Sequence, residues 1–372
     1  MPIDLPEEEL RAWLALLRAP QLGSSGVREA VSRHRSAAAA LVNTARASGT
    51  PDDLREALTS PDRDALARDR AWLEDPAHHL LTFASEDYPS LLRDIPNPPA
   101  ALFVVGDVTR LWSAQIAIVG ARRASMAGLA NARVFAKAFA EAGNTVTSGM
   151  AEGVDGAAHA AALDAGGSTI AVLGTGPDLV YPRQHTELAR RIAAHGALVS
   201  EFPPGTPGRA EFFPRRNRII AGLSLGTLVI EAGLKSGSLI TARLAAEQGR
   251  EVFALPGAIQ NPLARGCHRL IRDGAKLVES ADEVLDELRG MGALLAEGLR
   301  RRVAAPESVP HDSVHAVDPE YARLLGALDS APAALDELIA RTGLGAAALS
   351  SMLLVLELDG VVSAESGRYA LR

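Results

Sequence analysis

Residues 116–125 read IAIVGARRAS, and this stretch decides the fold. The unbroken apolar run is typical of a strand buried on both faces of a sheet. Gly120 allows the backbone to turn tightly at the end of this strand, and Ser125 is a suitable N-cap for a helix that we expect to begin near Met126. Strand, glycine turn and helix together predict the first unit of a Rossmann-like α/β domain.

The same alternation continues to about residue 289. Further strand-like runs are separated mostly by helix-length segments rich in alanine, leucine and arginine. These runs lie at residues 145–149, 169–174, 197–202, 227–232, 251–257 and 275–278. Apolar runs joined by helices predict a parallel sheet with helices on both faces, and such sheets bind ligands at the carboxyl ends of their strands. We therefore expect the functional residues in the turns that follow the strands.

Two more strand-like runs, at residues 80–84 and 101–106, precede this core. The prolines between them preclude a long helix. We expect these runs to form a strand pair added to the edge of the sheet. The predicted extended Rossmann-like core then spans residues 79–290.

Residues 1–78 predict a small helical domain that resembles SAM-like or degenerate helix-hairpin-helix modules. The expected helices cover residues 7–17, 27–41 and 62–73, with glycine-containing turns at 22–26 and 48–51. The first of these turns, LGSSG, is a poor match to the hairpin glycine signature. We therefore expect docking or packing, rather than DNA binding, from this domain.

Residues 291–317 lose periodicity and contain prolines, which predicts a linker. The order of helices and strands expected in residues 318–372 is typical of a winged-helix domain. Its expected third helix, residues 344–360, has no lysine or arginine, and the domain has eight acidic residues against four arginines. Since DNA phosphates would repel such a helix, we expect this domain to bind protein.

Composition limits the class of protein. The chain has 372 residues, 47% of them hydrophobic, and its single cysteine, Cys267, excludes a disulfide framework. The net charge of −7 argues against nucleic acid, yet residues 113–290 contain 19 Arg and Lys against 17 Asp and Glu. A local cationic surface therefore remains compatible with the charge. The acidic start and the lack of a membrane-length apolar run predict a soluble, cytoplasmic protein with no membrane partner.

Three turns after expected strands are suited to bind phosphate. In GARRAS, two arginines lie beside a helix N-terminus, whose free amides and dipole favour an anion. Two glycines bracket the loop in TSGMAEGVDG, and a lysine precedes another helix start in EAGLKSGS. The candidate residues of these turns are Gly120, Arg122, Arg123, Ser125, Gly149, Gly153, Lys235, Ser236, Gly237 and Ser238.

The segment EFFPRRNRIIAGLS, residues 211–224, combines aromatic and cationic side chains. Phosphates need cations, and unpaired bases need a flat apolar face on which to stack. We expect one phenylalanine to belong to the core and one arginine, Arg216 or Arg218, to tie the segment to the sheet, rather than all of these residues to contact DNA. The candidate residues are Arg209, Phe212, Phe213, Arg215, Arg216, Asn217 and Arg218, and Arg183 would extend the same surface.

Recognisable catalytic machinery does not occur in the sequence. It contains no Walker A motif, serine nucleophile elbow, HExxH motif or cysteine cluster. Asp155 and His159 are spaced to share a helix face, which would allow a metal-binding or acid–base pair, but we expect Asp155 to cap the helix or to bond the loop. We therefore expect a non-enzyme without cofactor or metal. Several turns suited to bind phosphate are expected at one edge of the sheet, and a polyanion could contact all of them, whereas a mononucleotide needs fewer. The pattern therefore favours single-stranded DNA over a mononucleotide.

The motifs GARRAS, TSGMAEGVDGAAH, FPRRNRIIAGLS and EAGLKSGSLITA, followed by ALPGAI and RGCHRLIRDGA, resemble the DprA/Smf family over about residues 80–290. The resemblance implies protection of incoming single-stranded DNA during natural transformation, dimerisation through the core, and loading of RecA recombinase. It also implies roles for particular residues. By this resemblance, Gly120, Arg122 and Arg123 would contact phosphate, and Phe213 would contact a base. Arg216 and Arg218 would lie at the pocket. Lys235, Ser236 and Ser238 would make further contacts with DNA. Some members have a lysine where this chain has Ala210, and Arg209 is its expected substitute.

Two other functions remain as alternatives. Phosphoribohydrolases of the LONELY GUY type have a related fold and a catalytic glutamate in a glycine-rich turn. In this chain Ile240 or Thr241 occupies that position, which argues against hydrolysis. Regulation of double-stranded DNA by the winged helix predicts duplex binding that survives deletion of residues 113–290.

Overall fold

The computed structural model describes residues 5–290, 319–328, 333–345, 349, 352–353, 356, 362–365 and 368–371. The chain forms two compact units, Met1–Arg300 and Arg301–Arg372. The predicted linker at 291–317, and most of the third helix expected in the winged-helix domain, lie outside the described residues.

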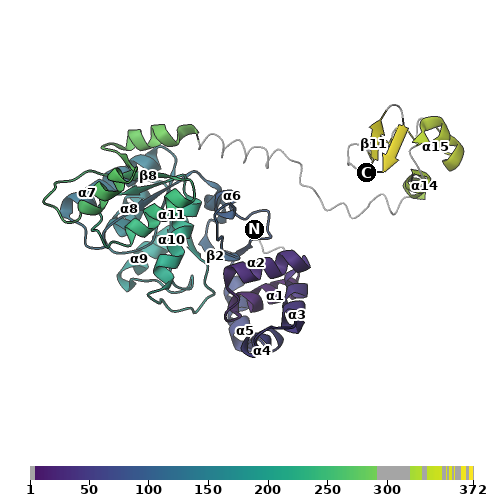
Figure 1. The fold of residues 1–372 in the computed structure, drawn as a ribbon, viewed down its shortest axis with the longest axis horizontal. Helices are drawn as coiled ribbons and strands as arrows, with labels where there is room; N and C mark the ends of the chain where they lie inside the picture. The colour runs from purple at the N-terminus through teal and green to yellow at the C-terminus, as the bar shows by residue number, and fades with distance from the viewer. Residues whose placement is uncertain are drawn as a thin grey trace. The chain divides into compact units, whose positions relative to one another are not determined.

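A nine-stranded sheet forms the centre of the first unit (Figure 1). Its strand order is β1-β2-β6-β5-β4-β3-β7-β8-β9. The strands are β1 (His78–Thr82), β2 (Ala101–Gly106), β3 (Gln115–Val119), β4 (Thr145–Ser148), β5 (Thr169–Val172), β6 (Ala197–Ser200), β7 (Gly226–Val229), β8 (Glu251–Ala254) and β9 (Lys276–Leu277). All neighbours from β6 to β9 pair in parallel, so these strands end at the same edge of the sheet. The prediction of a parallel Rossmann-like sheet is confirmed.

The predicted strand pair is also confirmed. β1 and β2 pair antiparallel, and β2 joins β6 in antiparallel register with Phe103 opposite Ser200. The pair therefore extends the parallel sheet at its β6 edge.

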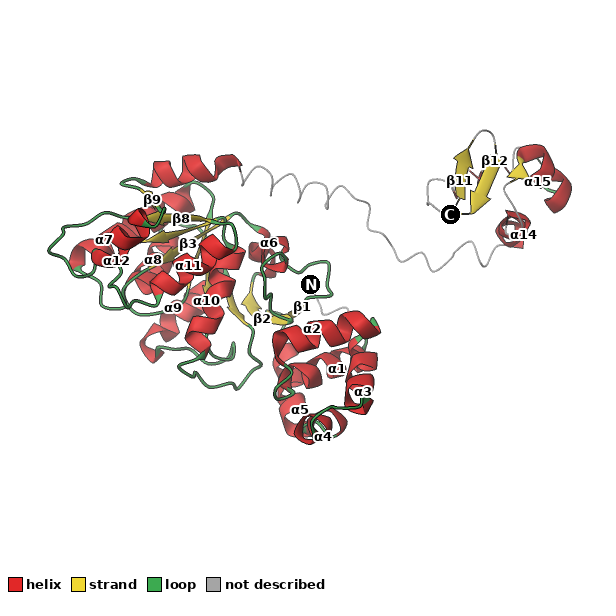
Figure 2. Ribbon diagram, viewed as in Figure 1, coloured by secondary structure: helices red, strands yellow, loops and turns green. Residues whose placement is uncertain are grey.

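Helices cover both faces of this sheet (Figure 2). They are α7 (Met126–Glu141), α8 (Val154–Asp164), α9 (Thr186–His195), α10 (Phe212–Leu223), α11 (Ser238–Glu247) and α12 (Arg265–Arg272). Alternate residues of β3 point to opposite faces: Ala117 packs in the cluster that includes α10 and α11, whereas Ile116 packs in the cluster that includes α7 and α8. Burial on both faces explains why the strand has no polar alternation.

The helical region before the sheet differs from its prediction. It consists of α1 (Glu7–Arg18), α2 (Gly23–His34), α3 (Ala37–Arg46), α4 (Asp52–Thr59) and α5 (Arg63–Leu73). The single helix predicted at 27–41 is wrong, because Arg35 adopts a left-handed φ of 62° and the Ser36 hydroxyl caps α3. The turn predicted at 22–26 is instead the start of α2. Its glycines suggested a turn, but tertiary packing of the helix overrides this weak local preference.

The helical region and the strand pair share one hydrophobic core. Trp13 and Leu16 of α1 are fully buried, and they belong to the same cluster as Phe103 of β2. Short α4 contributes only Leu54 and Leu58 to this cluster, which leaves too little periodicity to reveal the helix in the sequence.

The second unit has the predicted winged-helix elements in its described part. These are α14 (Pro319–Leu328), β10 (Ala333–Ala334), α15 (Leu335–Thr342), β11 (Val362–Glu365) and β12 (Arg368–Leu371). The strands form an antiparallel sheet in the order β10-β12-β11. In neither unit is any described helix both long enough and apolar enough to cross a lipid bilayer.

Candidate nucleic-acid interface

The sheet reverses its order of strand addition between β3 and β7. The chain moves from β3 outward through β4, β5 and β6, and it then returns to place β7 on the other side of β3. A crevice forms at such a switch point, at the carboxyl ends of the strands. The turns after β3 and β7 therefore lie next to each other, although they are about a hundred residues apart in the sequence.

Arg122 and Arg123 lie in the turn after β3, and both are exposed. Within residues 5–290, neither guanidinium group forms an ion pair. The Arg122 guanidinium lies 5.9 Å from the ring centroid of Phe213. The turn thus presents two unpaired cations, one of them beside an aromatic ring.

The helix N-terminus behind these arginines does not offer all its amides to a ligand. Ser125 is the N-cap of α7, as predicted, since its hydroxyl accepts a hydrogen bond from the Gly128 N–H. The Ser125 N–H, however, donates to a Glu231 carboxylate oxygen at 2.8 Å. The expectation of free amides here is wrong at this position, because the protein's own carboxylate occupies it.

In the turn after β4, too, a carboxylate of the protein itself accepts hydrogen bonds from backbone amides. Asp155 accepts hydrogen bonds from the N–H groups of Gly149 and Ala151, which confirms its predicted loop-bonding role. A Cβ on Gly149 would collide with the Arg216 guanidinium, and one on Gly153 would lie 2.3 Å from the Ala121 carbonyl oxygen. The two glycines therefore allow close packing between loops, and their predicted contact with DNA stays a prediction.

His159 does not pair with Asp155. Its Nδ1 lies 2.7 Å from the Thr169 hydroxyl, and burial lowers the pKa of the imidazole to about 3. The imidazole is thus neutral near pH 7. The hypothesis of an acid–base pair, which the spacing of the two residues allowed, is wrong.

The arginine-rich segment after β6 begins α10, and two of its arginines are buried. Arg216 donates to the carbonyl oxygens of Gly149 and Val172. Burial lowers its pKa to about 10, so this guanidinium stays charged at neutral pH. Arg218 donates to the carboxylate of Glu201 at 2.7 and 2.9 Å. The sequence allowed for one arginine tying this segment to the sheet, and the structure has two.

Arg215 is more accessible, with 44% of its side chain exposed, but it also pairs with Glu201 at 3.1 Å. Arg209 is exposed and lies 3.9 Å from the Glu211 carboxylate. Asn217 reaches across to the turn after β7, where its amide lies 3.5 Å from the Gly237 carbonyl oxygen. These contacts leave less cationic character on this segment than its sequence suggests.

The two phenylalanines differ in their surroundings. Phe212 stacks on the buried ring of Phe202, with centroids 4.2 Å apart. Phe213 is half-buried and lies 5.4 Å from the ring of Tyr181, which is 54% exposed. Phe213 therefore belongs to an aromatic pair at the surface, as base contact would require. Tyr181 was not predicted from the sequence, although an aromatic residue two positions before Arg183 was an available signal.

The turn after β7 completes the surface. Lys235 is exposed and forms no ion pair among the described residues. The hydroxyls of Ser236 and Ser238 lie 2.7 Å apart and bond each other, which shapes the start of α11. We use the name cationic rim for Arg122, Arg123 and Lys235 together with the rings of Phe213 and Tyr181.

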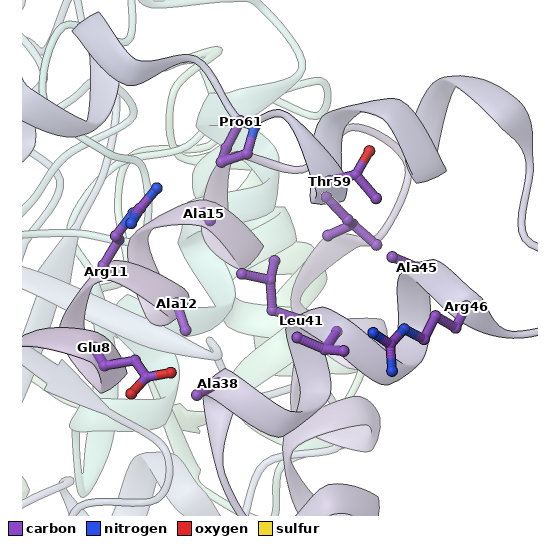
Figure 3. Close-up of a pocket in the computed structure, with 12 residues that line it drawn as sticks. Glu8, Arg11, Ala12, Ala15, Ala38, Leu41, Ala45, Arg46, Thr59 and Pro61 are labelled. Carbon is purple, nitrogen blue, oxygen red and sulfur yellow. The ribbon is translucent and has the colours of Figure 1, made fainter.

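A separate hollow of about 390 Å³ lies in the helical region (Figure 3). Its lining is mostly small and apolar, with Ala12, Ala15, Ala38 and Leu41 at its sides. Glu8, Arg11 and Arg46 also line it, and none of the residues of the cationic rim do.

Comparison with known proteins agrees with the fold. Residues 79–289 match the family model for DNA recombination-mediator protein A, and residues 305–368 match the DprA winged helix domain. The chain is 44% identical over 313 residues to protein Smf of Escherichia coli K12, covering 82% of this chain and 81% of the relative. It is 43% identical over 224 residues to DNA processing protein DprA of Bacillus subtilis, covering 60% and 75% of the two chains.

The fold of this chain is also similar to solved structures of DNA processing proteins. DprA from Streptococcus pneumoniae superposes with a TM-score of 0.67 at 35% identity, covering 74% of this chain and 97% of that one. DNA processing protein A from Helicobacter pylori, which has a unique single-stranded DNA binding mode, superposes with a TM-score of 0.52 at 28% identity, covering 57% and 96%.

Fold, strand-end surface and matches together define a DNA-processing protein built on a Rossmann-like core with a winged-helix domain. The chain belongs to the DprA/Smf family. The resemblance seen in its sequence motifs is thereby confirmed.

Proposed function

We propose that this protein binds single-stranded DNA on the cationic rim and hands the strand to RecA recombinase without catalysing a reaction. The observation that carries the proposal is the pair of exposed arginines, Arg122 and Arg123, which form no ion pair among the described residues, with Arg122 beside the surface ring of Phe213. The H. pylori relative with a single-stranded DNA binding mode supports it.

The geometry suggests how a strand is held. Because Glu231 and Asp155 occupy backbone amides of two turns, phosphates are contacted chiefly by the side chains of the rim. Unpaired bases stack on Phe213 and Tyr181, which a duplex cannot do because its base faces are already stacked. Such binding tolerates any sequence and falls steeply with salt.

The wider role follows from the family. We propose a cytoplasmic homodimer that protects single strands during natural transformation or repair. Light scattering tests the dimer, and the rate at which RecA assembles on a covered strand tests the loading. A strictly monomeric protein, or one that only delays RecA, would contradict these parts of the proposal.

The first test of the function compares two labelled DNAs by fluorescence anisotropy, an oligo-dT and a duplex of equal length, across a range of salt. We expect tight, salt-sensitive binding of the single strand and weaker binding of the duplex. Equal affinity for both would remove the support for base stacking. In parallel, incubation with nucleoside monophosphates tests catalysis, and release of free base would revive the phosphoribohydrolase alternative.

Replacement of Phe213 by alanine tests the base contact. We expect the affinity for oligo-dT to fall by about fivefold, near 1 kcal/mol, the low end of the range for one stacked base. The low end applies because Tyr181 and Gly174 already cover part of the ring. The salt dependence should not change, since no charge is removed. An abasic strand is the control: wild type and variant should bind it equally, and an equal loss on it would show that Phe213 does not meet bases.

A further inference from the structure

Glu231 lies just beyond β7, at the switch point of the sheet, and is only 7% exposed. Its carboxylate accepts hydrogen bonds from the Ser125 N–H at 2.8 Å and from the Ser125 hydroxyl at 2.6 Å. It also accepts one from the Asn261 amide at 3.1 Å. One carboxylate therefore links the turns after β3 and β7 to the loop after β8.

No cation balances this carboxylate directly, since Glu231 forms no ion pair within the described residues. It lies instead against the N-terminus of α7, where the helix dipole favours a negative charge. A Cβ on Gly128 would lie 2.4 Å from a Glu231 carboxylate oxygen. The first turn of α7 is thus packed directly onto the carboxylate, and the absence of a side chain at position 128 permits this contact.

We propose that Glu231 is a positioning residue for DNA: by holding Ser125, it fixes the turn that presents Arg122 and Arg123 to the phosphates. The inference rests on the proposed single-strand binding. Ser125 is both the N-cap of α7 and the end of the arginine turn, so its two bonds to Glu231 determine where that turn stops. A turn with this anchor keeps the two guanidinium groups in place before DNA arrives, which reduces the ordering cost of binding.

The loss of negative charge and the loss of the contact with Ser125 should change the DNA affinity of the variant Glu231→Gln in opposite directions. Removing a negative charge near the rim should strengthen DNA binding if only the overall electrostatic field matters. The Glu231 carboxylate accepts from three donors with two oxygens, whereas a glutamine has only one accepting oxygen. At least one of these bonds is therefore lost, which weakens the anchor if position matters. The sign of the change in affinity therefore separates the two effects.

The experiment measures oligo-dT binding by the full-length protein across salt for wild type, Glu231→Gln and Glu152→Gln. Glu152 is an exposed acid in the turn after β4, and its replacement changes the net charge equally. We expect Glu231→Gln to weaken binding about tenfold, the effect of losing a hydrogen bond to a charged group, and to flatten the salt dependence. Glu152→Gln should bind at least as tightly as wild type.

Ser125→Ala provides a second route to the same contact. It removes the hydroxyl bond to Glu231 and also the N-cap bond from the Gly128 N–H, and it leaves the buried carboxylate in place, so it serves as the test if Glu231→Gln fails to fold. We expect it to weaken binding and flatten the salt dependence in the same sense, and we expect the double variant to lose no more than Glu231→Gln alone. Thermal melting reports any general destabilisation, which by itself would leave the salt dependence of the folded protein unchanged.

Two results would overturn the inference in distinguishable ways. Wild-type protein that fails to bind oligo-dT would remove the proposed function and the inference together. Wild-type binding with Glu231→Gln or Ser125→Ala as tight as Glu152→Gln would leave the function intact and would show that Glu231 does not position the arginine turn.

Discussion

Replacing Arg122, Arg123 and Lys235 together with alanine is expected to weaken binding to oligo-dT roughly 100-fold at 0.1 M monovalent salt. Each phosphate contact with a single strand contributes about 0.7 to the slope of log K against log salt concentration, so three lost contacts remove about 2.1. The three side chains are exposed and carry no ion pair among the described residues, so their removal costs the fold little. Anisotropy titrations across salt measure both the affinity and the slope.

The matched control removes three other exposed cations. Lys137, Arg243 and Arg269 lie within helices and each pairs with an acid four residues further along the chain. Their triple alanine variant has the same net charge as the rim variant but keeps the cationic rim. We expect only a small change in affinity and slope. Comparable losses in both variants would mean that the general charge of the protein, rather than the rim, binds DNA.

Glu201→Ala is expected to lower the free energy of unfolding of the first unit by about 3–5 kcal/mol, the range for removing one partner of a buried ion pair. The Glu201 side chain is 1% exposed and pairs with Arg218, which is 9% exposed, and with Arg215. Alanine would leave the Arg218 guanidinium buried with no carboxylate. Glu201 also lies 3.3 Å from the Ser24 hydroxyl of α2, so the loss extends to contacts with the helical region. Urea unfolding followed by circular dichroism measures the change.

An exposed pair in the same unit is the control for Glu201. Glu187 pairs with Arg190 at 2.6 Å, but both side chains are at least 66% exposed. Its replacement by alanine should lower the free energy of unfolding far less than Glu201→Ala does, because solvent screens ion pairs at the surface. If Glu201→Ala costs no more than Glu187→Ala, the buried pair does not hold α10 to the sheet.

Several features of the fold could be predicted because their causes are local. The apolar run before Gly120 has strand character within itself, and Ser125 caps α7 through a bond to a residue only three positions away. The break between α2 and α3 was missed, although Ser36 caps α3 by the same kind of local bond. Its alanine-rich surroundings continue the helical pattern across the break, and periodicity alone does not register the left-handed Arg35.

The candidate site was predictable in outline but not in detail. The sequence placed its turns at strand ends, and the sheet topology brings the turns after β3 and β7 together. It did not show that Arg216 and Arg218 point inward while Arg122 and Arg123 remain exposed. All four are arginines in short arginine-rich motifs, so composition and spacing could not separate them.

By itself, then, the sequence determined the strands, most of the helices, the turns that carry cations, and the family to which they belong. Only the tertiary structure decided which of those cations face the solvent and which amides are already occupied. Arg216 bonds a carbonyl 67 residues away, and Ser125 bonds a carboxylate 106 residues away. Secondary structure depends largely on neighbouring residues, whereas the availability of a charge or an amide depends on partners that only the folded sheet brings within hydrogen-bonding distance.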